Sequence, residues 1–148
     1  ETLERTRLGQ LMVGDRVNLE LAMQADSRFG GHLVTGHVDG SGDFEAQQPA
    51  ARSVELTFRC DRTLAPYVTE KGAVCVDGVS LTVNRVIDEK DSFLFEVNVI
   101  PHTLAITTLG SLKAGAKVHI EVDLIARYLK RIHDCSDWSG KSVDLRCT

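Results

Sequence analysis

Three polar clusters in this sequence lie where turn-forming residues interrupt apolar segments, so their side chains are free for chemistry. The first is Thr35-Gly36-His37-Val38-Asp39. An extended chain alternates its side chains, which puts Thr35, His37 and Asp39 on one face, while Gly36 leaves the backbone open to a flat ligand. His37 is the candidate general acid or base, because an imidazole titrates near neutral pH.

Two further clusters offer hydroxyl and backbone groups. In Val79-Ser80-Leu81-Thr82-Val83 the same alternation places Ser80 and Thr82 on one face, where they suit the carbonyls and ring nitrogens of a heterocycle. Asn98-Val99-Ile100-Pro101-His102-Thr103 offers backbone groups at a strand end. Each cluster alone also fits a solvent-facing strand or a surface histidine, so only their combination indicates a site.

The sequence lacks the residue patterns of metal sites, hydrolase triads and nucleotide-binding loops. His32 and His37 fall on opposite faces of an extended chain and have no third partner, so we expect no metal. The sequence contains no Ser-His-Asp order, P-loop or G-x-G-x-x-G. The four cysteines form no C-x-x-C pair, which favours reduced thiols; they are Cys60, Cys75, Cys135 and Cys147.

The composition favours a small ligand or a protein partner. The formal net charge is −4 and the basic residues are scattered, which argues against nucleic acid or an anionic membrane as partner. No apolar run is long enough for a membrane span, and no signal-like segment is present. We therefore expect a cytoplasmic protein.

Short β-rich segments separated by turn signals predict an antiparallel barrel of about six strands. Asp77-Gly78 is a hairpin signal between two of them, and Asp39-Gly40-Ser41-Gly42 is interpreted as a turn. The expected strands are 32–36 with Val38, 53–59, 73–76, 79–83, 93–100 and 117–122.

Helices are expected at 63–68, at 102–105 and after Asp123, which we interpret as an N-cap. The apolar positions of 124–132 follow the helical period and form one stripe. That stripe could pack on the barrel or form an oligomer contact, and the sequence favours neither.

One pattern of residues occurs twice without an insertion. The first copy is Thr2-Leu3-x-x-Thr6-x-Leu8-Gly9-x-Leu11-x-x-Gly14-x-x-Val17-x-x-Glu20. The second is Thr103-Leu104-x-x-Thr107-x-Leu109-Gly110-x-Leu112-x-x-Gly115-x-x-Val118-x-x-Glu121. The interval is the size of a small domain, so we expect the end of one module followed by a complete second module.

Taken together, these segments resemble the riboflavin synthase family. Four motifs carry the resemblance in the same order: Gly30–Gly40, Lys71–Asn84, Ile100–Gly110 and Ile120–Tyr128. The resemblance implies an all-β fold of six-stranded antiparallel Greek-key closed barrels with short helices and a C-terminal α-helix. It also implies two such barrels in each subunit, a homotrimer and association with lumazine synthase.

The activity implied by the resemblance is a transferase reaction without a metal or organic cofactor. Two molecules of 6,7-dimethyl-8-ribityllumazine are dismutated to riboflavin and 5-amino-6-ribitylamino-2,4(1H,3H)-pyrimidinedione. Each barrel holds one lumazine, and the active site forms where the first barrel of one subunit meets the second barrel of its neighbour.

The resemblance also assigns roles to individual residues. Lys71 is implied to reach a ligand across the subunit interface, and for Asp123 a catalytic role competes with capping. The implied catalytic residues are His37, Ser80, Thr82 and Asp123. The implied substrate-binding residues are Gly36, His37, Val38, Lys71, Ser80, Leu81, Thr82, Asn98, Val99, Ile100, Pro101, His102, Thr103, Glu1 and Thr2.

The sequence departs from the family pattern, because it has neither the Met-Phe-Thr-Gly nor the Cys-Leu-Thr-Val motif of the first barrel. We expect a first-barrel remnant and linker at 1–29, the second barrel at 30–123, a trimerisation helix at 124–134 and a tail at 135–148. Because the reaction depends on positioning two lumazines, this chain alone should bind one but hardly turn it over.

Two alternatives remain open at this point. One is a non-catalytic lumazine or flavin carrier, similar to the lumazine proteins of luminous bacteria. The other is an unrelated β-barrel, such as those of flavin reductases or translation factors.

Overall fold

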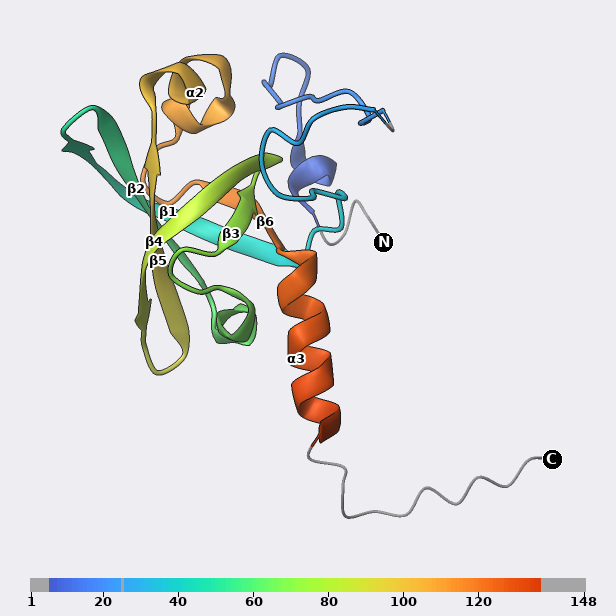
Figure 1. Ribbon diagram of the computed structural model, residues 1–148. Helices are drawn as coiled ribbons and strands as arrows, with labels where there is room; N and C mark the ends of the chain where they lie inside the picture. The colour runs from blue at the N-terminus through green and yellow to red at the C-terminus, as the bar shows by residue number, and fades with distance from the viewer. Residues whose placement is uncertain (1–5, 25, 137–148) are drawn as a thin grey trace.

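Six antiparallel strands close into a barrel in the computed structural model, which describes residues 6–24 and 26–136 (Figure 1). Neighbouring strands follow the order β1-β2-β5-β4-β3-β6, and β6 pairs with β1 to close the ring. The strands are β1 (Gly40–Ala50), β2 (Ser53–Asp61), β3 (Ala73–Val76), β4 (Val79–Asp88), β5 (Ser92–Val99) and β6 (Lys117–Val122). Closure gives each strand a partner on both sides, which confirms the predicted barrel.

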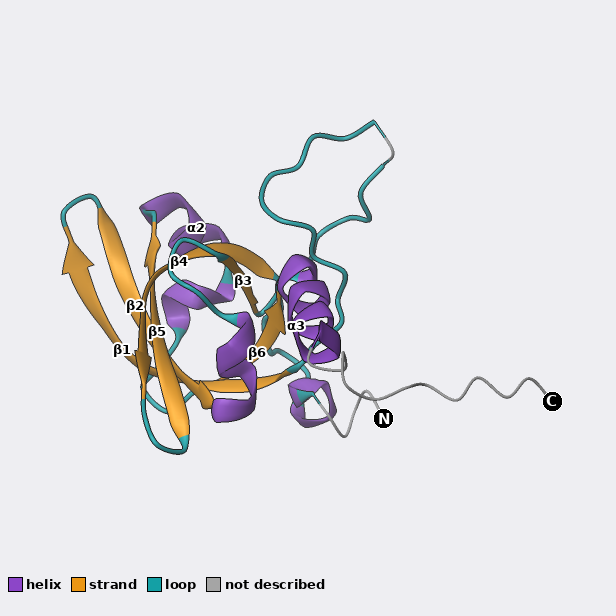
Figure 2. Ribbon diagram, turned by 60° about the horizontal axis from the view of Figure 1, so that its bottom comes forward, coloured by secondary structure: helices purple, strands orange, loops and turns teal. Residues whose placement is uncertain are grey.

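The connections between strands give the barrel a Greek-key topology. Strands β3, β4 and β5 follow one another as a meander, and β5 returns to pair with β2, which precedes the meander in the chain. Figure 2 looks toward the ring of strands, with α3 beside the ring and other helical segments overlapping its opening in this view. At the predicted hairpin, Asp77 and Gly78 have φ of 46° and 83°, and two successive positive values are typical of a type I′ turn.

Alternation along the strands builds the core. Val118, Ile120 and Val122 of β6 point into the barrel, whereas His119 and Glu121 lie on its outer side. Phe58 and Phe95 stack at the centre with their ring centroids 5.3 Å apart. Such fully buried side chains contribute roughly 1.5–3 kcal/mol each to the stability of the fold.

Within residues 6–24 and 26–136, five helical segments accompany the strands. They are η1 (Arg7–Gln10), η2 (Arg62–Tyr67), α2 (Pro101–Ile106), η3 (Thr108–Ser111) and α3 (Leu124–Ser136). Figure 1 shows α3 extending away from the barrel, and Asp123 caps it by accepting a hydrogen bond from the Ile125 N–H at 2.9 Å. The cap and the helix after it were both predicted. None of the helices in the described part of the chain has the length and hydropathy of a membrane span.

The first expected strand is wrong. Residues 32–38 form no strand, and β1 begins instead at Gly40, inside the segment interpreted as a turn. Gly40 and Gly42 pair with Ile120 and Val118 of β6 through the backbone alone. A glycine has no side chain to show the strand alternation, so the start of this strand gave no signal in the sequence.

Candidate functional site

Residues 30–39 precede β1 and lie against the outer side of the barrel, over β6, β3 and β4. They are called the covering segment below. Glu121 pairs with Cys75, and Cys75 pairs with Ser80, so the three residues form one row across these strands. The row faces outward, yet Glu121 and Cys75 are only 5% and 2% exposed. Hydrogen bonds from residues 32, 35 and 36 to this row show which segment covers it.

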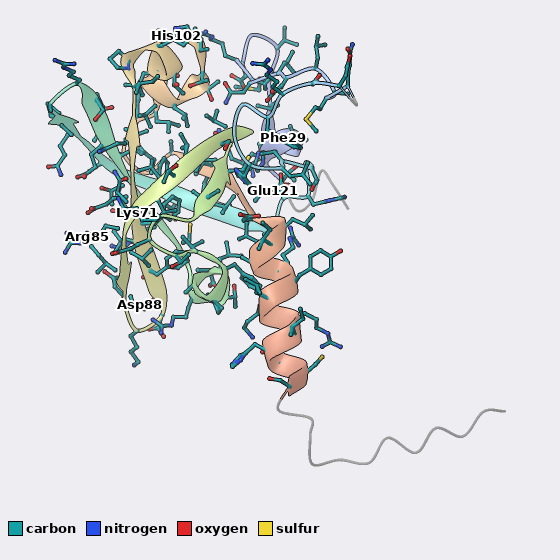
Figure 3. The ribbon with its side chains drawn as sticks, in the orientation of Figure 1. Phe29, Lys71, Arg85, Asp88, His102 and Glu121 are labelled. Carbon is teal, nitrogen blue, oxygen red and sulfur yellow. The ribbon has the colours of Figure 1, made fainter. Side chains whose placement is uncertain are left out.

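Glu121 anchors the covering segment. Its Oε1 accepts hydrogen bonds from the Thr35 N–H at 2.8 Å and from the Thr35 hydroxyl at 2.9 Å, and its Oε2 accepts one from the Gly36 N–H at 3.0 Å. Figure 3 shows Glu121 beside the start of α3. A buried carboxylate is costly unless hydrogen bonds replace its lost hydration, and these three donors do so.

The same contacts orient His37. The single hydroxyl proton of Thr35 goes to Glu121, so Thr35 Oγ1 must accept from His37 Nδ1, which lies 2.8 Å away. The neutral imidazole then carries its proton on Nδ1 and presents Nε2 as the base. Because His37 is exposed, this nitrogen is open to a ligand. Of the three side chains predicted to share a face, the structure therefore brings Thr35 and His37 together.

Two glycines allow the segment to follow this path. Gly36 has φ of +79°, in the left-handed region that favours glycine, and nothing lies within 4 Å of the position of an added Cβ. At Gly31 an added Cβ would lie 2.2 Å from Ser80 Oγ, so the backbone approaches β4 more closely than any side chain permits.

The Ser80 hydroxyl already has a hydrogen-bond partner, His32. Its hydroxyl oxygen accepts from the His32 N–H at 3.2 Å and lies 2.8 Å from His32 Nδ1. His32 Nε2 is buried without a partner among the residues that the structure describes. The Ser80 hydroxyl therefore holds the covering segment in place, in contrast to Thr82, which is exposed.

Helix α3 is tied to the same segment through Arg127. Its Nη2 donates to the His37 carbonyl at 2.9 Å and to Asp39 Oδ2 at 2.7 Å, and Asp39 Oδ2 also accepts from the Val122 N–H at 2.8 Å. Asp39 therefore does not share the hydrogen-bonded group of Thr35 and His37. It links the segment to β6 and to the helix.

A second group of predicted residues lies on the outer side of β4 and β5. Val83 pairs with Val97, which places Thr82 and Asn98 at neighbouring outward positions, and both are exposed. Lys71, before β3, has φ of +64° and donates its N–H to the Val83 carbonyl at 2.8 Å. A non-glycine residue in that conformation costs about 1–2 kcal/mol, so the fold holds Lys71 in a strained position beside this group.

Some predicted binding residues can offer only their backbone. Leu81 and Val99 point into the core and are 9% and 1% exposed. Ile100, Pro101 and His102 are exposed at the start of α2, where Figure 3 labels His102. Thr103 is half-buried, as is Asp123, while Val38 is half-buried in the covering segment. Glu1 and Thr2 lie outside the described residues.

The buried thiols of Cys75 and Cys60 are not nucleophiles. Burial, followed by the charge of Glu121, raises the pKa of Cys75 to about 12. Burial, followed by the charge of Asp43, likewise raises the pKa of Cys60 to about 12. Both stay protonated near neutral pH, which leaves chemistry here to the imidazole, hydroxyl and carboxylate groups.

Residues 35–123 match the family model described as the lumazine binding domain. The chain belongs to the lumazine-binding domain family. The match runs from Thr35 in the covering segment to Asp123 at the start of α3, so it includes both groups of candidate residues.

Relatives of this lumazine-binding domain include several riboflavin synthases. That of Mycobacterium tuberculosis (strain ATCC 25618 / H37Rv) is 46% identical over 132 residues, which are 89% of this chain and 65% of the relative. That of Photobacterium phosphoreum is 44% identical over 132 residues, 89% of this chain and 59% of the relative. The chain therefore spans less than two thirds of the length of these relatives.

Solved structures with the same fold include LumP complexed with 6,7-dimethyl-8-(1'-D-ribityl) lumazine. It has a TM-score of 0.65 and 21% sequence identity, and the match covers 80% of this chain and 60% of that chain. LumP complexed with riboflavin has a TM-score of 0.66 and 22% identity, with 81% and 63% covered. At these identities the likeness establishes the fold alone.

Sequence reasoning missed three residues that organise this lumazine-binding domain: His32, Glu121 and Arg127. Glu121 had a signal, because it ends the repeated pattern and is an acidic residue between two apolar positions of a strand. His32 was considered as a metal ligand and as the start of an expected strand, and Arg127 only as a residue of the Ile120–Tyr128 motif. Their contacts depend on the path of residues 30–39, which the sequence did not reveal.

Proposed function

We propose that this chain is the second lumazine-binding barrel of a riboflavin synthase. The enzyme would dismutate two molecules of 6,7-dimethyl-8-ribityllumazine, moving a four-carbon unit from one to the other to give riboflavin and 5-amino-6-ribitylamino-2,4(1H,3H)-pyrimidinedione. Donor and acceptor are the same compound, so the atoms balance without an oxidant or cofactor. The observation that supports this most strongly is the 46% identity to a riboflavin synthase across 89% of the chain.

The ligand in this proposal lies on the outer side of the barrel, between the covering segment and the exposed residues of β4 and β5. Thr82 and Asn98 would hydrogen-bond to ring carbonyls and nitrogens, and Lys71 would contact a ligand across a subunit interface. His37 would move a proton through Nε2, the nitrogen that the Thr35 contact leaves free. Asp123 remains a catalytic candidate beside its capping role.

The assembly in this proposal is a homotrimer joined through α3. Support comes from the four large apolar residues exposed along the helix, Ile125, Tyr128, Leu129 and Ile132, each between 62% and 67% exposed. Association with lumazine synthase stays a prediction from the resemblance. A cytoplasmic location is favoured by the free thiols of Cys60, Cys75 and Cys135, which are typical of a reducing compartment.

The test separates binding from turnover. The chain is titrated with 6,7-dimethyl-8-ribityllumazine while ligand fluorescence polarisation is followed, and riboflavin formation is measured with the chain alone and with a version carrying a complete first barrel. We expect binding by both and substantial turnover only by the two-barrel version. Absence of binding by both would disprove the proposal.

A carrier function is the second candidate, favoured by the LumP fold likeness. A carrier would bind the lumazine in both versions and form no riboflavin in either. The two-barrel assay therefore distinguishes the two functions directly.

A further inference from the structure

The two copies of the repeated pattern fold locally in the same way. Thr6 accepts a hydrogen bond from the Leu8 N–H at 3.3 Å at the start of η1, and Thr107 accepts one from the Leu109 N–H, also at 3.3 Å, at the start of η3. Each short helix ends with a further equivalent contact, Leu11 N to the Leu8 carbonyl and Leu112 N to the Leu109 carbonyl, both at 3.4 Å. The segment of copy one is therefore a structural equivalent of the segment before β6.

The surroundings of the two copies differ. Val118 and Ile120 of copy two are fully buried in the barrel, whereas their counterparts Val17 and Leu19 are 47% and 90% exposed. Asn18 is half-buried between exposed neighbours, and so are Thr6 and Arg7 at the start of η1. Apolar packing is therefore much weaker in copy one than in copy two, and polar contacts become the natural candidates for holding this segment.

The polar contacts between the copies are reciprocal. Arg7, the first residue of η1, donates its N–H to His119 Nε2 at 2.7 Å, and Thr108, the first residue of η3, donates its N–H to Asn18 Oδ1 at 2.8 Å. Thr108 is the counterpart of Arg7 in the repeat, and His119 is the counterpart of Asn18. Each copy thus satisfies the first free N–H of the other copy's short helix with a side chain from the same repeat position.

Exchange of equivalent contacts is the pattern of a two-fold interface, in which residue i contacts j and j contacts i across the axis. We propose that Asn18 and His119 form a reciprocal latch that docks the copy-one segment on the second barrel around a local two-fold axis. The docking surface on the barrel consists of Asp77, Thr108 and His119, and the partner that fits it is the sister repeat.

Asp77 supports both halves of the latch. Its Oδ1 accepts from the His119 N–H at 2.7 Å, its Oδ2 lies 3.7 Å from Arg7 Nη1, and its backbone carbonyl accepts from Asn18 Nδ2 at 2.8 Å. Asn18 Nδ2 also donates to Thr108 Oγ1 at 2.9 Å, which uses both functions of the amide. These residues line a cavity of about 210 Å³ between the segment and the barrel.

The repeat itself supplies the test. In His119→Asn the barrel carries the residue that copy one uses at the same position, so an acceptor remains, whereas His119→Leu removes it. Amide hydrogen exchange of Arg7 and Thr108, followed by NMR on the full chain, reports each half of the latch. His133→Leu, an exposed histidine of α3, is the matched control.

We expect His119→Leu to speed exchange of the Arg7 amide roughly fivefold or more, the effect of losing one net hydrogen bond, while His119→Asn and His133→Leu leave it nearly unchanged. Asn18→Leu should speed exchange of the Thr108 amide by a similar factor. Because Asn18 lies outside the barrel, this variant tests the latch even if the His119 variants fold poorly. Core amides such as Val83 and Val97 report global unfolding.

The proposal is overturned if the Arg7 and Thr108 amides exchange at unaltered rates in His119→Leu and Asn18→Leu. It is also overturned if His119→Asn loses as much protection as His119→Leu. The readout needs neither ligand nor turnover, so these outcomes are independent of the proposed synthase activity.

Discussion

The hydroxyl of Thr35 donates to the Glu121 carboxylate at 2.9 Å, and this one contact determines what the neighbouring His37 can do. With its proton committed to Glu121, Thr35 can only accept from His37 Nδ1. A buried carboxylate on a barrel strand thereby sets the tautomer of an exposed imidazole.

Thr35→Val should weaken this control of the His37 ring. Without the hydroxyl, both tautomers become accessible, and in a two-barrel version we expect kcat to fall roughly five- to tenfold with a smaller change in KM, because about one net hydrogen bond is lost. ¹⁵N NMR of the His37 ring should show mixed tautomers. Thr35→Ser keeps the hydroxyl and serves as the control. An equal fall in kcat in the two variants would show that the Thr35 hydroxyl does not control the His37 ring.

His37→Ala removes the proposed base and should lower kcat much more than lumazine affinity. The ring makes one hydrogen bond among the described contacts, from Nδ1 to Thr35 on an exposed part of the covering segment, so the barrel should be unaffected. Steady-state kinetics and a binding titration on the same two-barrel protein supply the comparison. Equal losses in turnover and affinity would show that His37 binds the ligand without moving a proton.

Gly31→Ala should displace the covering segment through a steric clash with Ser80, because the added Cβ would lie 2.2 Å from the Ser80 oxygen and 2.6 Å from its Cβ. We expect a loss of roughly 1–3 kcal/mol in thermal or chemical unfolding, together with weaker ligand binding. In Gly31→Ala/Ser80→Gly the clash is gone, and part of the stability lost in the single variant should return. If the double variant is the sum of the two single variants, the close approach is not the cause.

The barrel could be predicted from sequence because most of its strands carry side chains that show which way they face. The alternation in Val118-His119-Ile120-Glu121 and the Asp77-Gly78 turn are local signals, and both were confirmed. β1 could not be predicted at its start, because Gly40 and Gly42 pair through the backbone without side chains to show the period.

The candidate site was predicted as residue types but not as contacts. Thr35 and His37 lie two residues apart and do meet through a hydrogen bond, although the strand that was expected to bring them together, with Asp39, does not form. Glu121 and His32 meet this segment only after the chain has folded around the barrel, so no spacing in the sequence connects them.

The buried thiols should resist alkylation and should destabilise the fold at high pH. The pKa values of Cys60 and Cys75 are raised to about 12 in the folded state, from 9.0, so the stability they contribute is complete below pH 9 and is lost as pH rises toward 12. In Cys135→Ser/Cys147→Ser, iodoacetamide at pH 8.5 should label neither remaining thiol until denaturant is added. Rapid labelling of the native protein would contradict this burial.

Replacing apolar residues on α3 should change the assembly without disturbing the barrel. Leu129 and Ile132 are 62% and 64% exposed, and burying such a side chain at a subunit contact contributes roughly 1.5–3 kcal/mol. Leu129→Glu/Ile132→Glu introduces a good helix former at both positions and leaves the Arg127 contacts intact. It therefore tests the helix surface more specifically than a deletion from Leu124 onward would. Sedimentation velocity should show a shift toward monomer, while Arg131→Glu on the same helix leaves the particle size unchanged. If the double variant sediments like the unaltered chain, α3 is not the assembly element.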